Sequence, residues 1–417
     1  MADEYQGVDR NRRAEDIRDL PRRSERQDTS MRSNEGSIRS YFETRLGRME
    51  IVSTTETPSG QTVDWIPIES QVRKGESVAD PPSDRVRVRL PEGERVDRLV
   101  TFELEQEGAE LGPPGTVPVL RKDLERISYR QSLGDLIGKY PNIDRAYPIA
   151  GRLQAPPPSA SGPHRYANTA QSIIAFGGDG TLSAFDPYGE NTDDFSLMQI
   201  SCSNSDTGRL QTVEAGWQQR YDSYGDWVPH LFTYYTTNGY TSDGDNEGGY
   251  NEDVDGWVQV DGAVHPGALS SPNSVRGGAQ YVMQIKYQWY NDNWWLMCNG
   301  RWLGYYPSRL FMGSKSVFST LGDHADGIHF YGEIYDSDET PGKTRTDMGS
   351  GYWPEYGWTW AAYQRNLLVQ TDRAGSMADY DGGTGWASDP DMYDIETHMR
   401  SGSDWGSYFW MGGPGAG

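Results

Sequence analysis

The sequence predicts an all-β protein: an antiparallel β-sandwich or jelly-roll domain preceded by a small β-rich (α+β) module. The first observation is composition, because 49 Gly and 24 Pro in 417 residues exclude a helical bundle or a coiled coil. The second is an aromatic content of 12% within a hydrophobic fraction of only 35%. The third is a series of short strand-like runs, about 10 to 15 residues apart, which is typical of packed antiparallel sheets.

A run rich in proline, serine and glycine at 155–165 divides the chain and predicts an extended linker. Basic and acidic residues nearly balance before it, whereas 166–417 carries most of the net charge of −23 and all but one of the 14 tryptophans. We therefore expect the sandwich at 166–417 and a separate N-terminal module at 38–154. Residues 1–37 are too polar to offset the entropy cost of ordering, which predicts a disordered tail.

The local patterns predict the individual elements. In the module, the runs at 85–90 and 99–104 flank a Pro-Glu-Gly turn and predict a hairpin. An amphipathic helix is expected at 121–136. Beyond the linker, the expected strands are 171–176, 195–202, 210–219, 230–237, 256–260, 279–290, 294–298, 301–306, 328–335 and 359–370.

Charge, hydropathy and cysteine content exclude several classes of function. A net charge of −23 would repel a phosphate backbone, so we expect no nucleic acid as a partner. No apolar run approaches the roughly 18 residues that a membrane span requires. The polar N-terminus shows no signal peptide, so an extracellular location would require a non-classical route. Cys202 and Cys298 allow one disulfide at most, and their pairing stays open.

The familiar metal and nucleotide motifs are missing or have a simpler interpretation. The glycine-rich turn at 177–180 is followed by a strand-like run instead of the helix that a phosphate site needs. The histidines never show the HExxH spacing, and we expect no metal and no cofactor. The acidic loop at 243–255 has oxygen ligands suited to Ca²⁺, but without EF-hand spacing a solvated loop is favoured.

Two glutamates within predicted strands are the candidate catalytic groups. Alternation along 210–217 puts the apolar residues on one face and Glu214 on the other, between small side chains. Along 328–335, Glu333 likewise lies opposite the apolar face and shares its own face with tyrosines. By alternation alone, both could equally be ordinary solvent-facing residues.

At these positions the chain resembles the neprosin family of glutamic peptidases. The similar segments are, in order, Phe195–Ile200, Val213–Trp217, Gly225–Asp226, Leu231–Thr236, Asn238–Tyr240, Asn293–Leu296, Gly304–Pro307, Tyr331–Ile334, Thr346–Gly351 and Tyr408–Gly415. The resemblance implies a β-sandwich endopeptidase that works in acid, cleaves after proline and uses two glutamates, here Glu214 and Glu333. Which of the two is the acid and which the base stays open.

The resemblance also implies where the substrate binds and how the enzyme is controlled. The residues of the matching segments expected to contact a proline-containing peptide or protein are Gln199, Trp217, Tyr235 and Tyr331. The segments 60–65 and 112–119 look like the end of a family propeptide. We therefore expect the module to inhibit the enzyme until the linker is cut, with Pro158–Ser159 and Pro163–His164 as the expected bonds. Residues 1–37 would be available to dock a partner.

An alternative from another class stays open at this point. Aromatic side chains on a β-sandwich can stack on sugar rings, and paired carboxyl groups also hydrolyse glycosides. The chain would then be a carbohydrate-binding or non-catalytic structural component of a larger assembly.

Overall fold

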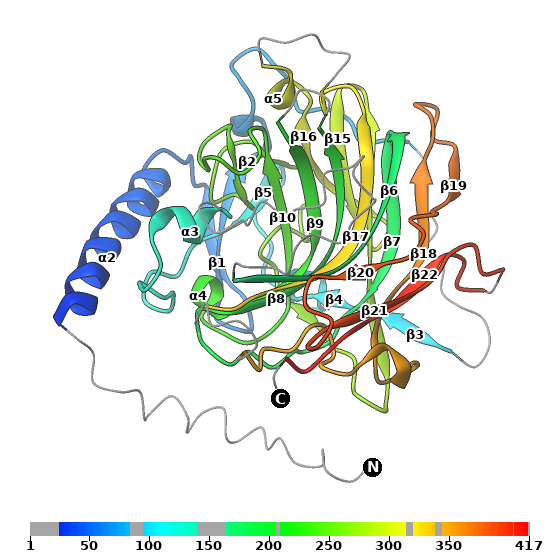
Figure 1. The fold of residues 1–417 in the computed structure, drawn as a ribbon. Helices are drawn as coiled ribbons and strands as arrows, with labels where there is room; N and C mark the ends of the chain where they lie inside the picture. Colours follow the sequence, from blue (N-terminus) through cyan, green and yellow to red (C-terminus); the bar gives the residue numbers. More distant parts are fainter. Residues whose placement is uncertain are drawn as a thin grey trace.

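Two large sheets packed face to face form the body of the protein (Figure 1). The computed structural model describes residues 25–83, 95–139, 163–205, 209–313, 320–337, 344–402 and 404–415. Within these ranges, seven strands form one sheet, ten form the other, and both are almost entirely antiparallel. This confirms the predicted antiparallel β-sandwich.

The smaller of the two sheets carries the candidate catalytic residues. Its spatial order is β11 (Gly248–Tyr250), β10 (His230–Thr236), β9 (Gln211–Arg220), β8 (Phe195–Asn204), β17 (Ala325–Tyr335), β6 (His164–Ala175) and β20 (Trp386–Ala387). The other sheet runs β12 (Val258–Gln259), β16 (Arg301–Pro307), β15 (Asn293–Cys298), β14 (Gln280–Tyr290), β7 (Gly177–Ser183), β18 (Ala362–Gln370), β22 (Tyr408–Gly412) and β21 (Asp394–His398). Two short strands extend it: β19 (Met377–Asp379) pairs with β18, and β3 (Asp97–Leu99) pairs with β14.

The remaining elements are short and mostly belong to the module. A small sheet contains β1 (Ser53–Glu56), β2 (Thr62–Pro67) and β5 (Thr116–Leu120), and β4 (Thr101–Phe102) pairs with β13 (Ser270–Ser271). The helices are α2 (Glu25–Leu46), α3 (Leu133–Ile137), α4 (Tyr221–Tyr224) and α5 (Arg309–Met312), with 3-10 turns η2 (Ile68–Gln71), η3 (Glu103–Glu105) and η5 (Pro354–Tyr356). No helix among the described residues is both long and apolar enough to cross a membrane.

The main core fills the space between the two sheets. On β9 the inward residues are Val213, Ala215 and Trp217, and all three are fully buried. They meet inward residues of β14 such as Ile285 and Tyr287. Because side chains alternate along a strand, the residues between them are directed to the outer face of the smaller sheet.

Four local predictions differ from the structure. Residues 177–180, expected to form a glycine-rich turn, are instead the first part of strand β7 and pair with β14. Helix α2 begins at Glu25, inside the stretch expected to be a tail, and residues 1–24 lie outside the described residues. The 85–90 arm of the predicted hairpin also lies outside them, and 99–104 pairs with distant strands. The helix expected at 121–136 is wrong except for α3, because 121–131 runs along the sandwich instead, where the Ser128 amide donates to the Asp222 carbonyl.

The module is joined to the sandwich by strand pairing and by a buried ion pair. Strand β3 lies parallel to β14, so the N-terminal part contributes directly to the larger sheet. Asp97 of β3 accepts from Arg365 of β18 at 2.7 Å, and both side chains are completely buried. Val100 and Phe102, next along the chain, belong to the main core.

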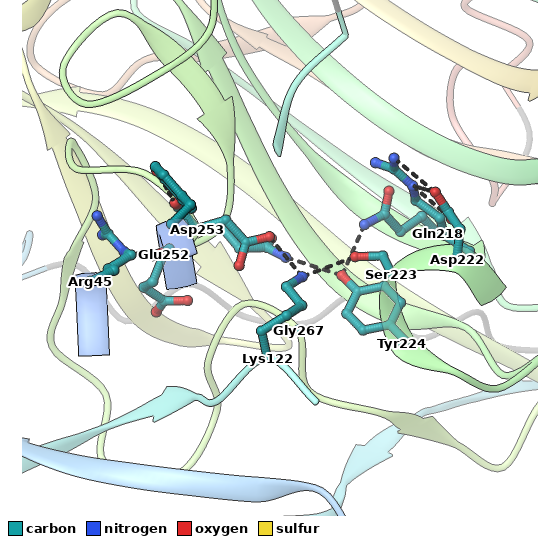
Figure 2. Close-up of polar contacts among 12 residues, drawn as sticks. Arg45, Lys122, Gln218, Asp222, Ser223, Tyr224, Glu252, Asp253 and Gly267 are labelled. Carbon is teal, nitrogen blue, oxygen red and sulfur yellow. Dashed lines mark hydrogen bonds and ion pairs between the residues drawn. The ribbon is translucent and has the colours of Figure 1, made fainter. Parts of the chain in front are cut away.

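A second junction binds basic residues of the module to the acidic loop at 243–255. Figure 2 shows Lys122 between two partners, 2.7 Å from Asp253 Oδ2 and 3.0 Å from the Ser223 hydroxyl. From α2, Arg45 donates to the Glu252 carbonyl at 2.8 Å and pairs with Asp255 at 2.9 Å. The acidic loop therefore serves as a docking surface for the module.

Candidate active site

Three adjacent strands place the two glutamates on the outer face of the smaller sheet. The central strand β8 has β9 with Glu214 on one side and β17 with Glu333 on the other. Glu214 lies opposite Ser201, and Glu333 lies opposite Leu197, so the two carboxyl groups flank one short stretch of β8. The alternation argument is thus confirmed for the facing of both residues.

Close packing of β9 against β8 explains why residue 216, two positions after Glu214, is a glycine. A Cβ on Gly216 would lie only 1.9 Å from the Met198 carbonyl oxygen of β8. Any larger residue would push β9 away from β8. Glycine at this position therefore keeps the strand that carries Glu214 close to the centre of the site.

Glu214 is held by a ring of donors and is fully buried. Four of them are neutral: Thr212 Oγ1 at 2.7 Å and Tyr240 OH at 2.6 Å on Oε1, and Gln199 Nε2 at 2.7 Å and Tyr331 OH at 3.3 Å on Oε2. The fifth is the ammonium of Lys139, 2.7 Å from Oε2. These contacts fix the carboxyl plane.

The partners of Glu333 differ from those of Glu214, because they include two basic side chains besides the neutral Tyr166. His164 Nδ1 lies 2.6 Å from Oε1, and Lys139 Nζ lies 3.6 Å from Oε2. Burial acts to raise the pKa of Glu333, but the charge of Lys139 and the hydrogen bond from His164 hold that pKa below its ordinary value. The two glutamates therefore meet at a single ammonium while having unlike surroundings.

Lys139 reaches the site from the N-terminal module and closes it. Its backbone amide donates to Asp243 Oδ2 at 3.1 Å, and the other oxygen of Asp243 accepts from Tyr234 OH at 2.7 Å. The preceding residue must be small, because a Cβ on Gly138 would lie 2.0 Å from the Asp243 side chain. The segment before the linker is therefore packed tightly against Asp243, and this packing places Lys139 next to both carboxyl groups.

Two of the four residues expected to bind substrate lie at this site. Gln199 and Tyr331 both contact Glu214. Trp217 and Tyr235 are directed to the opposite face of the sheet, where Trp217 Nε1 donates to the Ser183 carbonyl and Tyr235 OH to the Asp255 carbonyl. Because both are in the main core, the structure does not bring them to the site.

The sequence reasoning missed Lys139, His164, Thr212 and Tyr240. Signals existed for two of them, because Thr212 shares the strand face of Glu214 and Tyr240 ends the Asn-Gly-Tyr segment of the resemblance. Lys139 lies before the predicted linker and His164 near its end, where β6 begins, and no periodicity or spacing connects them to the glutamates.

The other candidate groups take structural roles. Within the described ranges, no three His, Cys, Asp or Glu side chains gather closely enough to hold a metal ion. In the acidic loop, Asp243, Asp245, Asp253 and Asp255 accept from residues of the module. Cys202 and Cys298 are both free and buried.

Comparison with known proteins identifies the class and then the family. The sequence profile described as Neprosin matches residues 192–414, more than half of the chain. With its β-sandwich and paired glutamates, the protein is a peptidase of the glutamic type. The chain belongs to the neprosin family.

Three solved structures that align with parts of this chain have little sequence in common with it. Scytalido-glutamic peptidase, determined with a transition state analog inhibitor, is 8% identical with a TM-score of 0.31, over 60% of this chain and 96% of its own. Apo Crh5 transglycosylase is 11% identical with a TM-score of 0.24, over 50% and 78%. CG-16, a homodimeric agglutinin from chicken liver, is 12% identical with a TM-score of 0.20, over 41% and 92%.

Proposed function

We propose that the protein is a latent, acid-active endopeptidase that cleaves after proline and uses Glu214 and Glu333 to activate water. The observation that carries the proposal is the convergence of both glutamates on one ammonium, with Lys139 Nζ 2.7 Å from Glu214 and 3.6 Å from Glu333. Cleavage after proline is the part that comes from the family resemblance.

The chemistry follows from placing two carboxyl groups in one buried site. Both cannot ionise cheaply once Lys139 has left, so one keeps its proton while the other is charged. The charged carboxylate takes a proton from water as the water attacks the scissile carbonyl. The protonated carboxyl group polarises that carbonyl and then gives its proton to the departing amine. Gln199 and Tyr331 stand beside Glu214, where their N–H and O–H groups can donate to the developing oxyanion.

Latency follows from the position of Lys139. Its ammonium occupies the space between the carboxyl groups where the attacking water and the scissile bond would lie. Acid weakens this contact, because a protonated carboxyl group no longer attracts the ammonium. Activation at low pH therefore begins with withdrawal of Lys139 and continues with cleavage of the linker.

Of the two bonds expected to be cut, only Pro163–His164 lies within the described residues. Pro163 is buried, and its carbonyl accepts from the Asp336 amide at 2.8 Å, so Pro163–His164 is part of the folded sheet margin. Pro158–Ser159 lies outside the described residues. We therefore propose Pro158–Ser159 as the activating cleavage.

Peptide digestion with mass spectrometry tests the proposal. The full-length chain is incubated at about pH 4, where a paired-carboxyl enzyme is expected to work, with two peptides that differ only by proline or alanine at one position. We expect cleavage after proline and no cleavage of the alanine peptide. Equal cleavage of both peptides would remove the proline preference, and cleavage of neither would contradict the proposed activity.

A further inference from the structure

We propose that His164 is a positioning residue that keeps Glu333 ionised in acid, which makes Glu333 the base that deprotonates water and Glu214 the acid. The inference rests on the proposed function and deepens it, because it assigns the two roles that the motif leaves interchangeable. It concerns the enzyme after Lys139 has left the site.

The imidazole of His164 is fixed next to Glu333. His164 is the first residue of β6 and lies opposite Tyr335 in the β6–β17 pairing. Its Nδ1 is 2.6 Å from Glu333 Oε1, and both side chains are almost completely buried. The rings of Tyr335, Phe195 and Tyr166 surround it at centroid distances of 5.0, 5.8 and 6.2 Å. The ring therefore cannot turn away from the carboxylate without repacking its neighbours.

Without Lys139, the two glutamates differ in the charge of their remaining partners. The remaining partners of Glu214 are an amide and three hydroxyl groups, all neutral, from Gln199, Thr212, Tyr240 and Tyr331. Glu333 retains the imidazole of His164, whose Nδ1 lies 2.6 Å from Oε1 and lowers the pKa of Glu333 through its hydrogen bond and charge. This contact favours the ionised carboxylate.

The single proton that the two carboxyl groups share then resides on Glu214. An ionised Glu333 disfavours a second charge in the same site. The hydroxyl groups around Glu214 suit either state, because each can donate to a carboxylate or rotate to accept from a carboxyl O–H. The surroundings of Glu214 therefore tolerate the protonated form that a general acid requires.

The other charged groups near His164 do not cancel this effect. Its backbone carbonyl accepts from Arg165, whose guanidinium is 3.4 Å from Asp389. Arg220 lines the same small pocket and is paired with Asp222 at 3.0 Å. Asp135 also lines this pocket, but it belongs to the segment that carries Lys139.

The second ring nitrogen of His164 lies beside a small pocket. Nε2 is buried and has no hydrogen-bond partner among the described residues. Gly138 and Lys139 line the same pocket as His164. When that segment withdraws, solvent can reach the imidazole.

The test is the pH profile of kcat/KM for a proline peptide, measured on the acid-activated enzyme. His164→Asn retains a neutral N–H donor but removes the imidazole. Because an opposite charge within a few ångströms shifts a carboxyl pKa by about 1 to 3 units, we expect the acidic limb to move up by at least about 1 pH unit. His265→Asn, at another buried histidine, should leave the limb in place. A uniform loss of kcat/KM without movement of the limb would overturn the proposal.

A second measurement, which leaves His164 in place, does not depend on the folding of the His164 variant. The infrared difference spectrum at pH 4 between Glu214→Gln and the double variant Glu214→Gln/Glu333→Gln, both cut at the linker by added wild-type enzyme, isolates the Glu333 carboxyl group. We expect the loss of an ionised carboxylate band. Loss of a protonated carboxyl band would overturn the role of His164 while leaving peptide cleavage intact, whereas an inactive wild-type enzyme would contradict the proposed function itself.

Discussion

Lys139 Nζ lies 2.7 Å from Glu214 Oε2 in a contact between two fully buried side chains. The two residues come from opposite sides of the linker, so one part of the chain neutralises the candidate catalytic carboxyl group of the other. Neither charge has access to bulk water. A buried pair of this kind costs roughly 3 to 5 kcal/mol when one partner is removed.

Replacing Lys139 should open the active site to substrate at a higher pH than in the wild type. In Lys139→Met the glutamates lose their shared cation, and the closed arrangement is disfavoured by about 100-fold or more, since each 1.4 kcal/mol is a factor of ten. We expect the full-length variant to cleave a proline peptide at a higher pH than the wild type does, measured as initial rates between pH 3 and 7. Lys74→Met, at an exposed lysine of the module, is the matched control. An unchanged onset pH would show that Lys139 does not control access.

Glu214→Gln and Glu333→Gln should each abolish cleavage in a folded protein. Glutamine preserves the shape and most hydrogen bonds but cannot exchange a proton, and general acid-base catalysis typically contributes about 100-fold to 10,000-fold. The measurement is kcat/KM at pH 4 together with circular dichroism. Retention of more than about a tenth of the activity in either variant would exclude that residue from the chemistry.

The module should stay bound after the linker is cut. β3 pairs with β14, and the Asp97–Arg365 ion pair is completely buried, so acid-nicked protein should elute as one species at neutral pH and separate only in denaturant. Asp97→Ala should lower the free energy of unfolding by about 3 to 5 kcal/mol, because Arg365 loses its buried partner. Asp379→Ala, at an exposed aspartate of β19, serves as the control. Two separately eluting fragments would contradict this.

Buried histidine should limit stability in acid. Burial lowers the pKa of His265 from 6.5 to about 4. The neutral side chain therefore contributes stability that is fully present above pH 6.5 and is lost as the pH falls through this range toward 4. The loss amounts to about 3 kcal/mol at pH 4, since each pKa unit corresponds to roughly 1.4 kcal/mol.

His265→Asn should thus reduce the drop in melting temperature between pH 7 and pH 4. The partly exposed His398 gives the control variant His398→Asn. An identical drop in His265→Asn and the wild type would show that this histidine does not titrate on unfolding.

The sequence was sufficient to predict which face of the sheet a strand residue occupies. Glu214 and Glu333 could be placed on the outer face because their neighbours are apolar on the other side. The same alternation puts Trp217 with the core, and the expectation that it binds substrate came from its motif alone. Lys139 could not be predicted, because its contacts join positions 75 and 194 residues apart through a tertiary arrangement. The predicted helix at 121–136 failed for a similar reason, since contacts with the sandwich override local propensity.

The parallel pairing of β3 with β14 links the folding of the sandwich to the N-terminal module. A strand from before the linker can join this sheet only when two distant parts of the chain have already come together, which makes the step slow and dependent on the intact polypeptide. A gene truncated at the linker would encode a sheet with an unpaired edge along 280–282, and such edges promote aggregation. We therefore expect the sandwich to fold efficiently only when residues 97–99 belong to the same polypeptide, which a comparison of refolding yields of the whole chain and of 163–417 would test.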